Sequence, residues 1–388
     1  MIDLHDNKVS LPMRGSSTLL LQEVVGHNLS LSAIQRAVNS DRLHHAYLFH
    51  GPEGVGKKRS ALSIARLLLC LHPQSVDNQR EACGACKSCQ RVKRYILGES
   101  DAFHPDLHLI TRQRDSGGKL AKEIKIAPVR ELQSALNLGA FEGGCSVVVI
   151  EDVDRLGLSA ANALLKTLEE PLPNVYFFLT TSSLNAVLPT IISRAQSLRF
   201  AALNTKTLHK LLLQLESMPE APEGGRALNE VQRESIAQLS GGSLGRAISL
   251  WENGGMEKVE SLIKGSDLNG GPQDLLSALN FAKSFEKSSE EEISLWIHLL
   301  RCWYRDALVL LHGANIPSLF FPAYQEYTTR RAQHLGAQRL LWRLQALDEG
   351  ERHMLKRTGS NRKLIMETLC LYLAGFDAIN ARPLQLSS

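Results

Sequence analysis

The residues with the clearest chemical potential follow an apolar segment near the middle of the chain. Residues 147–150 are Val-Val-Val-Ile and lead directly into Glu151 and Asp152. Acids after a buried strand form half of a phosphate and magnesium site, where an Asp supports the metal and a following Glu polarises the attacking water. The order here is inverted, so Asp152 stands where a Glu is expected, and its side chain is one methylene group shorter than that Glu. Because catalytic placement tolerates about an ångström, we expect this inversion to cost much of any hydrolysis. The alternative is that the acids simply end a strand where it meets solvent.

A glycine-rich loop earlier in the chain supplies the other half of such a site. Residues 51–58 match the phosphate-loop pattern G-x-x-x-x-G-K-[ST] except at the last position. Lys57 would reach the β- and γ-phosphates, while Lys58 replaces the hydroxyl residue that holds magnesium, and an ammonium cannot ligate a cation. Three glycines would let the backbone and the next helix N-terminus approach the phosphates: Gly51, Gly54 and Gly56.

This loop predicts a phosphate-loop fold and leaves open whether ATP or ADP binds. The alternative is a glycine turn between strand and helix without any ligand. We expect the loop and the acids to lie at the carboxyl ends of neighbouring strands, where parallel sheets bind ligands.

A cluster of cysteines follows the phosphate-loop helix. The candidate ligands combine a C-x-x-C-x-x-C run with one earlier thiol: Cys70, Cys83, Cys86 and Cys89. Four thiolates can close a tetrahedral zinc site with no open position, which is structural and not catalytic. Iron–sulfur ligation also uses such runs, but the isolation of the cluster in a loop favours zinc, and free thiols are the remaining alternative. The other cysteines lie in apolar patterns and are expected in cores: Cys145, Cys302 and Cys370.

Two arginines stand at positions where a guanidinium could meet a phosphate. Arg194 lies at a predicted sheet edge, from which an arginine could stabilise charge on a γ-phosphate bound in a neighbouring subunit. Arg246 stands in the first turn of a helix that follows the glycine turn at 241–245. The alternative for each is an ordinary solvated arginine.

The segments that would position these residues alternate from residue 31 to about residue 200. Predicted strands at 47–50, 107–110, 146–150 and 175–179 are separated by helical spacing, which indicates a parallel sheet with helices on both faces. The helices of this part are expected at 59–71, 129–138 and 160–168. Beyond residue 200 only helical spacing remains, at 208–215, 231–251, 275–285, 290–311, 331–347 and 362–373.

These patterns divide the 388 residues into a loose tail and three domains. The tail is residues 1–20, which carry no periodicity. An α/β domain with an inserted cysteine module at about 70–105 is expected at 21–200. A small helical domain at 201–263 and a helical domain at 272–388 complete the chain, with Pro/Gly-rich loops at 219–225 and 264–272.

The composition is that of a globular protein, with 44% apolar and 22% charged residues. A net charge of +4 is too small to indicate nucleic-acid binding from the field of the whole chain. No apolar run approaches the roughly 18 residues of a membrane helix, and residues 1–15 have no apolar core. We therefore expect no membrane partner, no secretory signal and a cytoplasmic location.

Taken together, these motifs resemble the AAA+ clamp-loader subunits of bacterial DNA polymerase III. The resemblance is strong over residues 24–252 and thinner afterwards, where it rests on 303–306 and 361–369. It implies a P-loop (AAA+) domain with a zinc module, a helical lid domain and an all-α C-terminal collar that joins a ring. The motifs that carry it are the three spaced cysteines and residues 45–57, 104–106, 126–132, 161–171, 193–194 and 242–247.

The resemblance also implies partners and roles. The ring would contain tau/gamma and delta subunits, and it would place a sliding clamp on primer–template DNA. Arg194 matches the arginine finger that reaches the adjacent motor subunit, Arg246 the lid arginine that senses nucleotide, and Thr181 the sensor position. The four clustered cysteines match the zinc ligands. Ala195 replaces the usual Cys of the finger motif, with no expected consequence because the arginine carries the charge.

Lys58 and the inverted acids depart from the ATP-hydrolysing subunits of this family, whose loop ends in Lys-Thr or Lys-Ser. They suit a subunit that donates Arg194 in trans and has no independent catalytic activity, which is our first hypothesis. The second is an active ATPase motor of the tau/gamma type, against which Lys58 and the lack of a long C-terminal extension argue. The third is a zinc-containing DNA-binding module on a degenerate P-loop fold. It is supported by a cluster of basic residues beside the cysteines, although such clusters usually form only a solvent-exposed surface: Lys87, Arg91, Lys93 and Arg94.

Overall fold

The computed structural model describes residues 26–76, 78–96, 99, 101–113, 120–142, 144–216, 227–252, 272–286, 288, 290–313, 319–355 and 362–374. The predicted tail at 1–20, the loop at 219–225 and all but the last residue of the loop at 264–272 lie outside these ranges.

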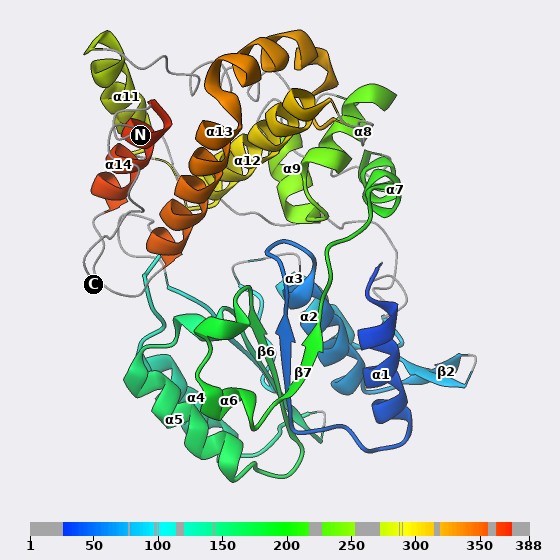
Figure 1. Ribbon diagram of the computed structural model, residues 1–388. Coiled ribbons are helices and arrows are strands. Elements are labelled where there is room, and N and C mark those ends of the chain that lie inside the picture. The colour runs from blue at the N-terminus through cyan, green and yellow to red at the C-terminus, as the bar shows by residue number, and fades with distance from the viewer. Residues whose placement is uncertain are drawn as a thin grey trace, which may run out of the picture. The chain divides into compact units, whose positions relative to one another are not determined.

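A five-stranded parallel sheet forms the centre of the α/β part (Figure 1). Its strand order is β4-β5-β6-β1-β7, which confirms the predicted parallel architecture. Four strands coincide with predicted apolar runs, and the edge strand β7 was not predicted as a strand. The strands are β1 (Ala46–His50), β4 (Leu107–Ile110), β5 (Ser146–Ile150), β6 (Val175–Thr181) and β7 (Gln196–Arg199).

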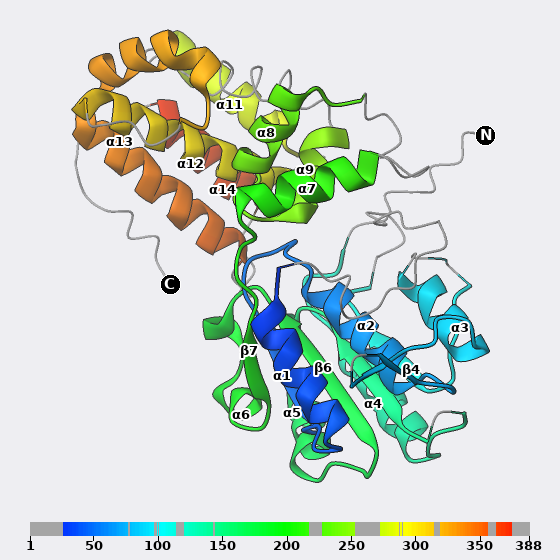
Figure 2. The ribbon, with the colours of Figure 1, turned by 90° about the vertical axis from the view of Figure 1, so that its right-hand side faces the viewer.

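Helices cover both faces of this sheet (Figures 1 and 2). Side chains of a strand alternate between faces, so Tyr47 and Phe49 of β1 enter one core while Ala46 and Leu48 enter the other. One face carries α1 (Asn28–Asn39) and α2 (Lys57–Leu68), with α3 (Lys87–Ile96) packed on α2. The opposite face carries α4 (Ile126–Leu136), α5 (Leu158–Glu169) and α6 (Pro189–Ile192).

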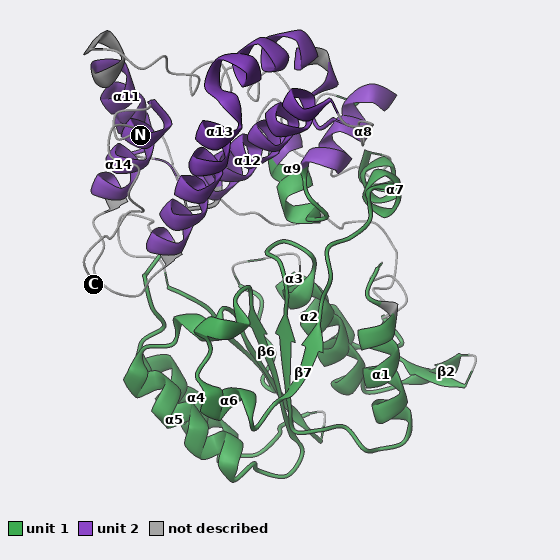
Figure 3. Ribbon diagram, in the orientation of Figure 1, with its two compact units in different colours: residues 1–228, 240–249 green, residues 229–239, 250–388 purple. Residues whose placement is uncertain are grey.

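After the sheet the chain continues in helices, as its spacing predicts. These are α7 (Thr205–Glu216), α8 (Glu230–Leu239) and α9 (Leu244–Glu252). The helical spacing at 231–251 is broken between α8 and α9, where Gly241 and Gly242 both adopt positive φ angles. The chain forms two compact units (Figure 3), one of residues 1–228 and 240–249 and one of residues 229–239 and 250–388. The division into separate lid and collar domains stays a prediction.

The second unit is helical in its described residues. It contains α8, α11 (Pro272–Ser284), α12 (Glu290–His312), α13 (Gln325–Leu355) and α14 (Arg362–Ala374). α13 is interrupted at Gly336, whose φ of +75° is not helical. Trp296, Trp303 and Tyr304 of α12 are almost fully buried and anchor its core. Among the described residues, no helix combines the length and apolar character that crossing a membrane requires.

Candidate functional site

The phosphate loop lies between β1 and α2, as its sequence predicts. Gly56 precedes the first turn of α2 with a φ of +104°, a left-handed conformation that glycine adopts without strain. The ammonium of Lys57 is buried and donates hydrogen bonds to the carbonyls of Gly51 (2.7 Å) and Pro52 (2.6 Å). Burial lowers the pKa of Lys57 against the opposing attraction of nearby carboxylates, the first of which is Glu53. Lys57 is therefore folded back onto its own loop.

The glycine turn before α9, residues 240–245, lies directly on this loop. The N–H of Gly245 donates to the carbonyl of Gly54 at 3.0 Å. Gly54 has a φ of +72°, and a Cβ there would lie 2.3 Å from Oγ of Ser243 and 3.2 Å from the backbone of Gly245, so glycine is favoured at this position. Arg246 follows in the first turn of α9, and its backbone N–H donates to Oγ of Ser243 at 3.1 Å. The structure thus brings the segment carrying Arg246 to the phosphate loop.

His27 is a contact of the phosphate loop that the sequence analysis missed. Its Nε2 lies 2.7 Å from the carbonyl of Val55, and its ring packs on Phe200 with a centroid distance of 4.6 Å. Burial lowers the pKa of His27, which favours the neutral ring. The sequence carried no clear signal for this contact, because a histidine just before a helix has many ordinary explanations.

The acids do not follow the strand next to β1, contrary to our expectation. β6 lies between β1 and β5 in the sheet, so Glu151 follows a strand two places away from the loop. Lys58 spans this gap from the first turn of α2. Its Nζ lies 3.0 Å from Oε2 of Glu151, with 41% and 30% of the two side chains exposed. An ion pair therefore joins the two positions that would share a magnesium ion in a hydrolysing site.

Asp152 occupies a strained backbone position at the same edge of the sheet. Its φ of +53° is left-handed, which is uncommon for a residue other than glycine. Arg112, a residue the sequence analysis missed, places Nε 3.3 Å from the Asp152 carboxylate. Burial nevertheless raises the pKa of Asp152 to about 6. The cost of ionising this carboxylate exceeds the help it receives from Arg112.

Thr181 ends β6 and pairs in register with His50 at the end of β1, beside the phosphate loop. Its hydroxyl is fully buried and donates to Oδ1 of Asp154 at 2.6 Å, while it accepts the N–H of Ser183 at 3.0 Å. Thr181 therefore lies beside the phosphate loop, with its hydroxyl proton directed at a carboxylate of its own chain, and its sensor role stays a prediction.

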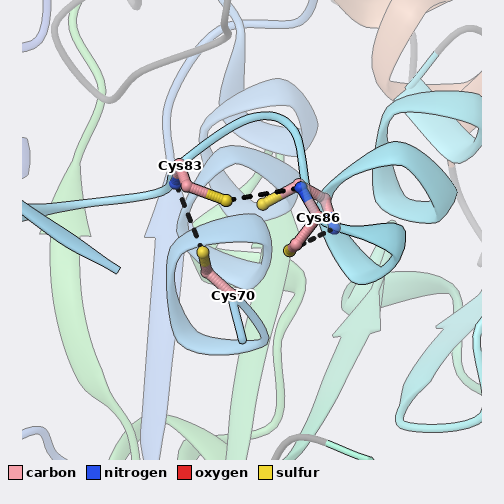
Figure 4. Close-up of side chains that lie close together, drawn as sticks. Cys70, Cys83 and Cys86 are labelled. Atoms are coloured by element: carbon pink, nitrogen blue, oxygen red, sulfur yellow. Dashed lines mark hydrogen bonds between the residues drawn. The ribbon is translucent and has the colours of Figure 1, made fainter. Parts of the chain in front are cut away.

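The predicted cysteine ligands come together in space. One sulfur from each of the four thiols lies within 4.8 Å of the others: Cys70, Cys83, Cys86 and Cys89. Three N–H···S contacts link them, from the N–H of Cys83 to Cys70, of Cys86 to Cys83 and of Cys89 to Cys86, at 3.2 to 3.4 Å (Figure 4). Burial opposes ionisation of Cys86, yet these and neighbouring hydrogen bonds lower its pKa to about 7. The cluster can hold a metal ion.

The segment between Cys70 and Cys83 folds as a hairpin that was not predicted. Strands β2 (Gln74–Val76) and β3 (Gln79–Glu81) pair antiparallel and return the chain to Cys70. Gln35 and Asn39 of α1 hold this hairpin through bonds to the backbone of Arg80 at 2.7 and 3.0 Å. The length of the linker is thus compatible with Cys70 as the fourth ligand.

A buried histidine fixes the helix that carries Cys89. Ser88 donates its hydroxyl to the carbonyl of Leu69 at 2.6 Å and lies 2.8 Å from Nε2 of His104. Nδ1 of His104 accepts the N–H of Asp106 at 3.1 Å, so Nε2 carries the proton that Ser88 receives. Burial lowers the pKa of His104, consistent with this neutral ring.

The basic residues beside the cysteines are largely paired with acids. Arg91 and Lys87 lie 2.8 and 3.2 Å from the carboxylate of Glu142. Arg94 contacts Glu99 at 2.5 Å and Asp101 at 2.6 Å. Local acids thus neutralise much of the charge that the third hypothesis assigned to nucleic acid.

Arg194 lies at the opposite edge of the sheet from the phosphate loop of its own chain. It precedes β7, whose Gln196 pairs with Tyr47 and whose Arg199 pairs with His50. Because the loop follows His50, roughly 10 Å of strand separates the two ends. The guanidinium forms an ion pair with Glu169 at 2.7 Å and donates to the carbonyl of Thr190 at 3.0 Å. Arg194 therefore lies far from the phosphates that its own loop would bind.

The structure thus separates three groups of predicted residues. The phosphate loop, Glu151, Asp152, Thr181 and the turn before Arg246 gather at the carboxyl edge of the sheet. The four cysteines form a cluster beyond α2. Arg194 stands by itself at the amino edge.

Two family models match the chain. One is described as "DNA polymerase III, delta subunit" and matches residues 26–204. The other is described as "DNA polymerase III, delta subunit, C terminal" and matches residues 261–374. Between them they include the α/β part and most of the described helices that follow it.

Similar proteins carry related names. The DNA polymerase III subunit delta' of Bacillus subtilis (strain 168) is 33% identical over 189 residues, which are 49% of this chain and 52% of that protein. The same subunit of Escherichia coli (strain K12) is 29% identical over 343 residues, or 85% of this chain and 89% of that protein. A solved structure of a DNA polymerase III gamma subunit-related protein from Thermotoga maritima has a TM-score of 0.38 at 17% identity, covering 88% of this chain and 98% of that chain.

Proposed function

We propose a function from the premise that this chain belongs to the delta-prime family of DNA polymerase III subunits, the AAA+ clamp-loader type. In this proposal it is a subunit of a ring that places a sliding clamp on primer–template DNA. It lends Arg194 to the nucleotide site of an adjacent ATPase subunit and does not hydrolyse ATP itself.

The position of Arg194 is the observation that carries the proposal. An arginine finger acts by stabilising charge on the transferred phosphoryl group, so it has to lie at a surface that a neighbouring site can reach. Arg194 is 34% exposed in its side chain and stands at the amino edge of the sheet. Its own phosphate loop is at the carboxyl edge. An arginine so placed can serve a nucleotide only in trans.

Three contacts support the absence of hydrolysis in this chain. The Lys58–Glu151 ion pair takes up the carboxylate and the helix position that would otherwise hold magnesium. The hydroxyl of Thr181 is committed to Asp154. The carboxylate of Asp152 is also not free, because it lies 3.3 Å from Nε of Arg112. A water-activating base near a bound triphosphate needs a free and ionised carboxylate.

The two competing hypotheses receive less support. The family models that match are those of delta subunits, and the Bacillus subtilis and Escherichia coli relatives described above are delta-prime subunits, which does not favour a tau/gamma motor. A DNA-binding module needs exposed positive charge for phosphate contacts. The ion pairs of Arg91 with Glu142 and of Arg94 with Glu99 and Asp101 leave little for that purpose.

We assign zinc to the cysteine cluster as a structural ion. Four thiolates in tetrahedral coordination, with zinc–sulfur distances of about 2.3 Å, fit sulfurs that already lie within 4.8 Å of one another. The N–H···S contacts stabilise the thiolate of Cys86, whereas burial raises the pKa of Cys70 and Cys89, so binding of the ion would have to displace their protons. All four positions are filled by protein, so the ion would have no place for a substrate.

The partners follow from the same family membership. We propose that the second, helical unit forms the collar that joins the ring with tau/gamma and delta subunits. The sliding clamp and primer–template DNA would be met by the assembled complex. This function places the chain in the cytoplasm, where the bacterial chromosome is replicated.

The decisive experiment compares Arg194→Ala with the wild-type chain in a reconstituted ring with its partner subunits, sliding clamp and primed DNA. We expect ring assembly to persist and DNA-stimulated ATP hydrolysis by the partners to fall by at least about tenfold, because finger arginines contribute 10³ or more elsewhere. Arg36→Ala, which removes an exposed arginine of α1, is the matched control and should leave the rate unchanged. Normal hydrolysis with Arg194→Ala would remove the finger assignment.

A second measurement tests the absence of hydrolysis. The isolated chain is assayed for ATP turnover alongside Lys57→Ala. Turnover above background that disappears in the Lys57→Ala variant would contradict the proposal and restore the motor hypothesis.

A further inference from the structure

Arg194 is held by contacts from two different elements. Its Nη2 lies 2.7 Å from Oε1 of Glu169, the last residue of α5. Its Nη1 donates to the carbonyl of Thr190 at 3.0 Å and to Oγ of Ser193 at 3.2 Å. The Nε–H of Arg194 has no hydrogen-bond partner among the described residues. Both terminal nitrogens of the guanidinium are therefore held by its own chain, and the Nε–H remains available to a phosphate.

Glu169 stands where a carboxylate is not favoured by its own helix. The carboxyl end of a helix carries partial negative charge, which repels an anion in the last turn. The guanidinium of Arg194 offsets this repulsion at 2.7 Å. The neighbouring Glu170 is exposed and follows the helix as its cap residue. The two glutamates are thus adjacent in sequence and differ in whether they contact the arginine.

We propose that Glu169 is a positioning residue for Arg194, which it holds in the direction required by the nucleotide site of the adjacent subunit. This inference rests on the proposed arginine-finger function. An arginine side chain has large rotamer freedom, and electrostatic stabilisation of a transition state requires that charge be oriented before the reaction. Glu169 reduces that freedom on the side of the guanidinium that faces its own chain.

The strength of the Arg194–Glu169 ion pair decides whether Glu169 positions the arginine or keeps it away from the nucleotide of the adjacent subunit. The side chains of Arg194 and Glu169 are 34% and 48% exposed, and ion pairs so exposed change an equilibrium by no more than about fivefold. A multiply charged triphosphate attracts a guanidinium more strongly than one exposed carboxylate does. Glu169 therefore cannot prevent Arg194 from contacting the triphosphate of the adjacent subunit, but it can favour one orientation of the guanidinium before that contact forms.

The test is performed in the reconstituted ring with sliding clamp, primed DNA and ATP. We expect Glu169→Ala to lower the maximal rate of DNA-stimulated hydrolysis about two- to fivefold, with the KM for ATP unchanged within twofold. The effect falls on kcat because the finger contacts charge that develops in the transition state. Glu169→Gln keeps an acceptor oxygen at the same distance from the backbone and should stay within twofold of the wild-type rate.

Two further variants test whether the effect is specific to Glu169 and acts through Arg194. Glu170→Ala removes the adjacent exposed glutamate and should leave the rate unchanged. Glu169→Ala combined with Arg194→Ala should be no slower than Arg194→Ala alone, because a positioning residue has no effect once the group it positions is gone.

The outcomes separate this inference from the function on which it rests. A wild-type rate with Arg194→Ala removes the finger itself. A large loss with Arg194→Ala and no loss with Glu169→Ala overturns the positioning role and leaves the finger in place. A faster rate with Glu169→Ala would identify an inhibitory contact and also overturn it. A Gln variant as slow as the Ala variant, or a changed KM, would overturn it as well.

Discussion

The ammonium of Lys58 lies 3.0 Å from the carboxylate of Glu151, so an ion pair ties the first turn of α2 to the end of β5. Strand β6 runs between the two strands that lead to these residues. In a hydrolysing phosphate-loop protein, the corresponding helix position carries a hydroxyl and the metal lies between it and the strand acid. Here the ammonium of Lys58 supplies the positive charge and links α2 to the end of β5 without a divalent ion.

The first prediction concerns the strength of this ion pair. Because its side chains are 41% and 30% exposed, we expect a coupling free energy of about 0.5–1 kcal/mol between Lys58→Met and Glu151→Gln. Urea unfolding of the wild type, both single variants and the double variant measures it. Lys166→Met, which changes an exposed lysine of α5, should show no coupling with Glu151→Gln. A coupling near zero for Lys58 would mean that solvent screens the pair completely.

The second prediction concerns pH and Asp152. Burial raises its pKa from 3.8 to about 6 in the folded chain, so the folded state binds more protons than the unfolded state between about pH 4 and pH 6. Its contribution to stability therefore falls as pH rises through this window and is unfavourable above it.

We accordingly expect Asp152→Asn to raise the Tm at pH 7.5, by a few degrees at most because 36% of the side chain is exposed. This advantage should shrink at pH 5, where the wild-type carboxylate is largely protonated in the folded state. Differential scanning calorimetry at both pH values measures the change. A lower Tm for the variant at pH 7.5 would show that the ion pair with Arg112 outweighs burial.

The third prediction concerns metal removal. We expect about one zinc ion per chain by elemental analysis, and loss of that ion in Cys86→Ser. Cys302→Ser, which changes a buried cysteine of the helical unit, should retain it. Metal binding is coupled to local folding, so chelation should lower the Tm of the wild type and leave that of Cys86→Ser unchanged. An iron–sulfur absorption band, or a chain without metal, would contradict the assignment.

The fourth prediction concerns the contact between the phosphate loop and the glycine turn. Gly54→Ala should destabilise the chain by about 1–3 kcal/mol through its φ of +72°. It should also displace the turn, because its Cβ would lie 2.3 Å from Oγ of Ser243 and 3.2 Å from the backbone of Gly245. Gly56→Ala is the matched variant, with a φ of +104° but open space around the added carbon. Greater proteolytic sensitivity at residues 240–245 in Gly54→Ala than in Gly56→Ala would reveal the displacement, and equal sensitivity would count against the contact.

Most of the regular elements could be predicted because their signals are local. The apolar runs at 107–110 and 146–150 coincide with β4 and β5, and helical spacing gave α12 within one residue at its end. The short strands β2, β3 and β7 escaped prediction. β2 and β7 are exposed along most of their length, so they lack the buried apolar pattern on which strand prediction depends.

The amino-acid sequence by itself determined which residue types could bind phosphate or metal. The spacing of Gly51, Gly56 and Lys57 specified a loop before a helix, and the spacing of the cysteines specified a cluster, because turn geometry and ligand spacing are properties of short segments.

Only the tertiary structure decided which of these residues meet. Strand order placed β6 between the loop and Glu151, and register placed Arg194 at the edge away from its own phosphate loop. The partners Glu169, Arg112 and His27 could not be recognised in the sequence, because each lies 25 or more residues from the group it contacts. Contacts over such separations are fixed by how the strands and helices pack, and no local pattern encodes them.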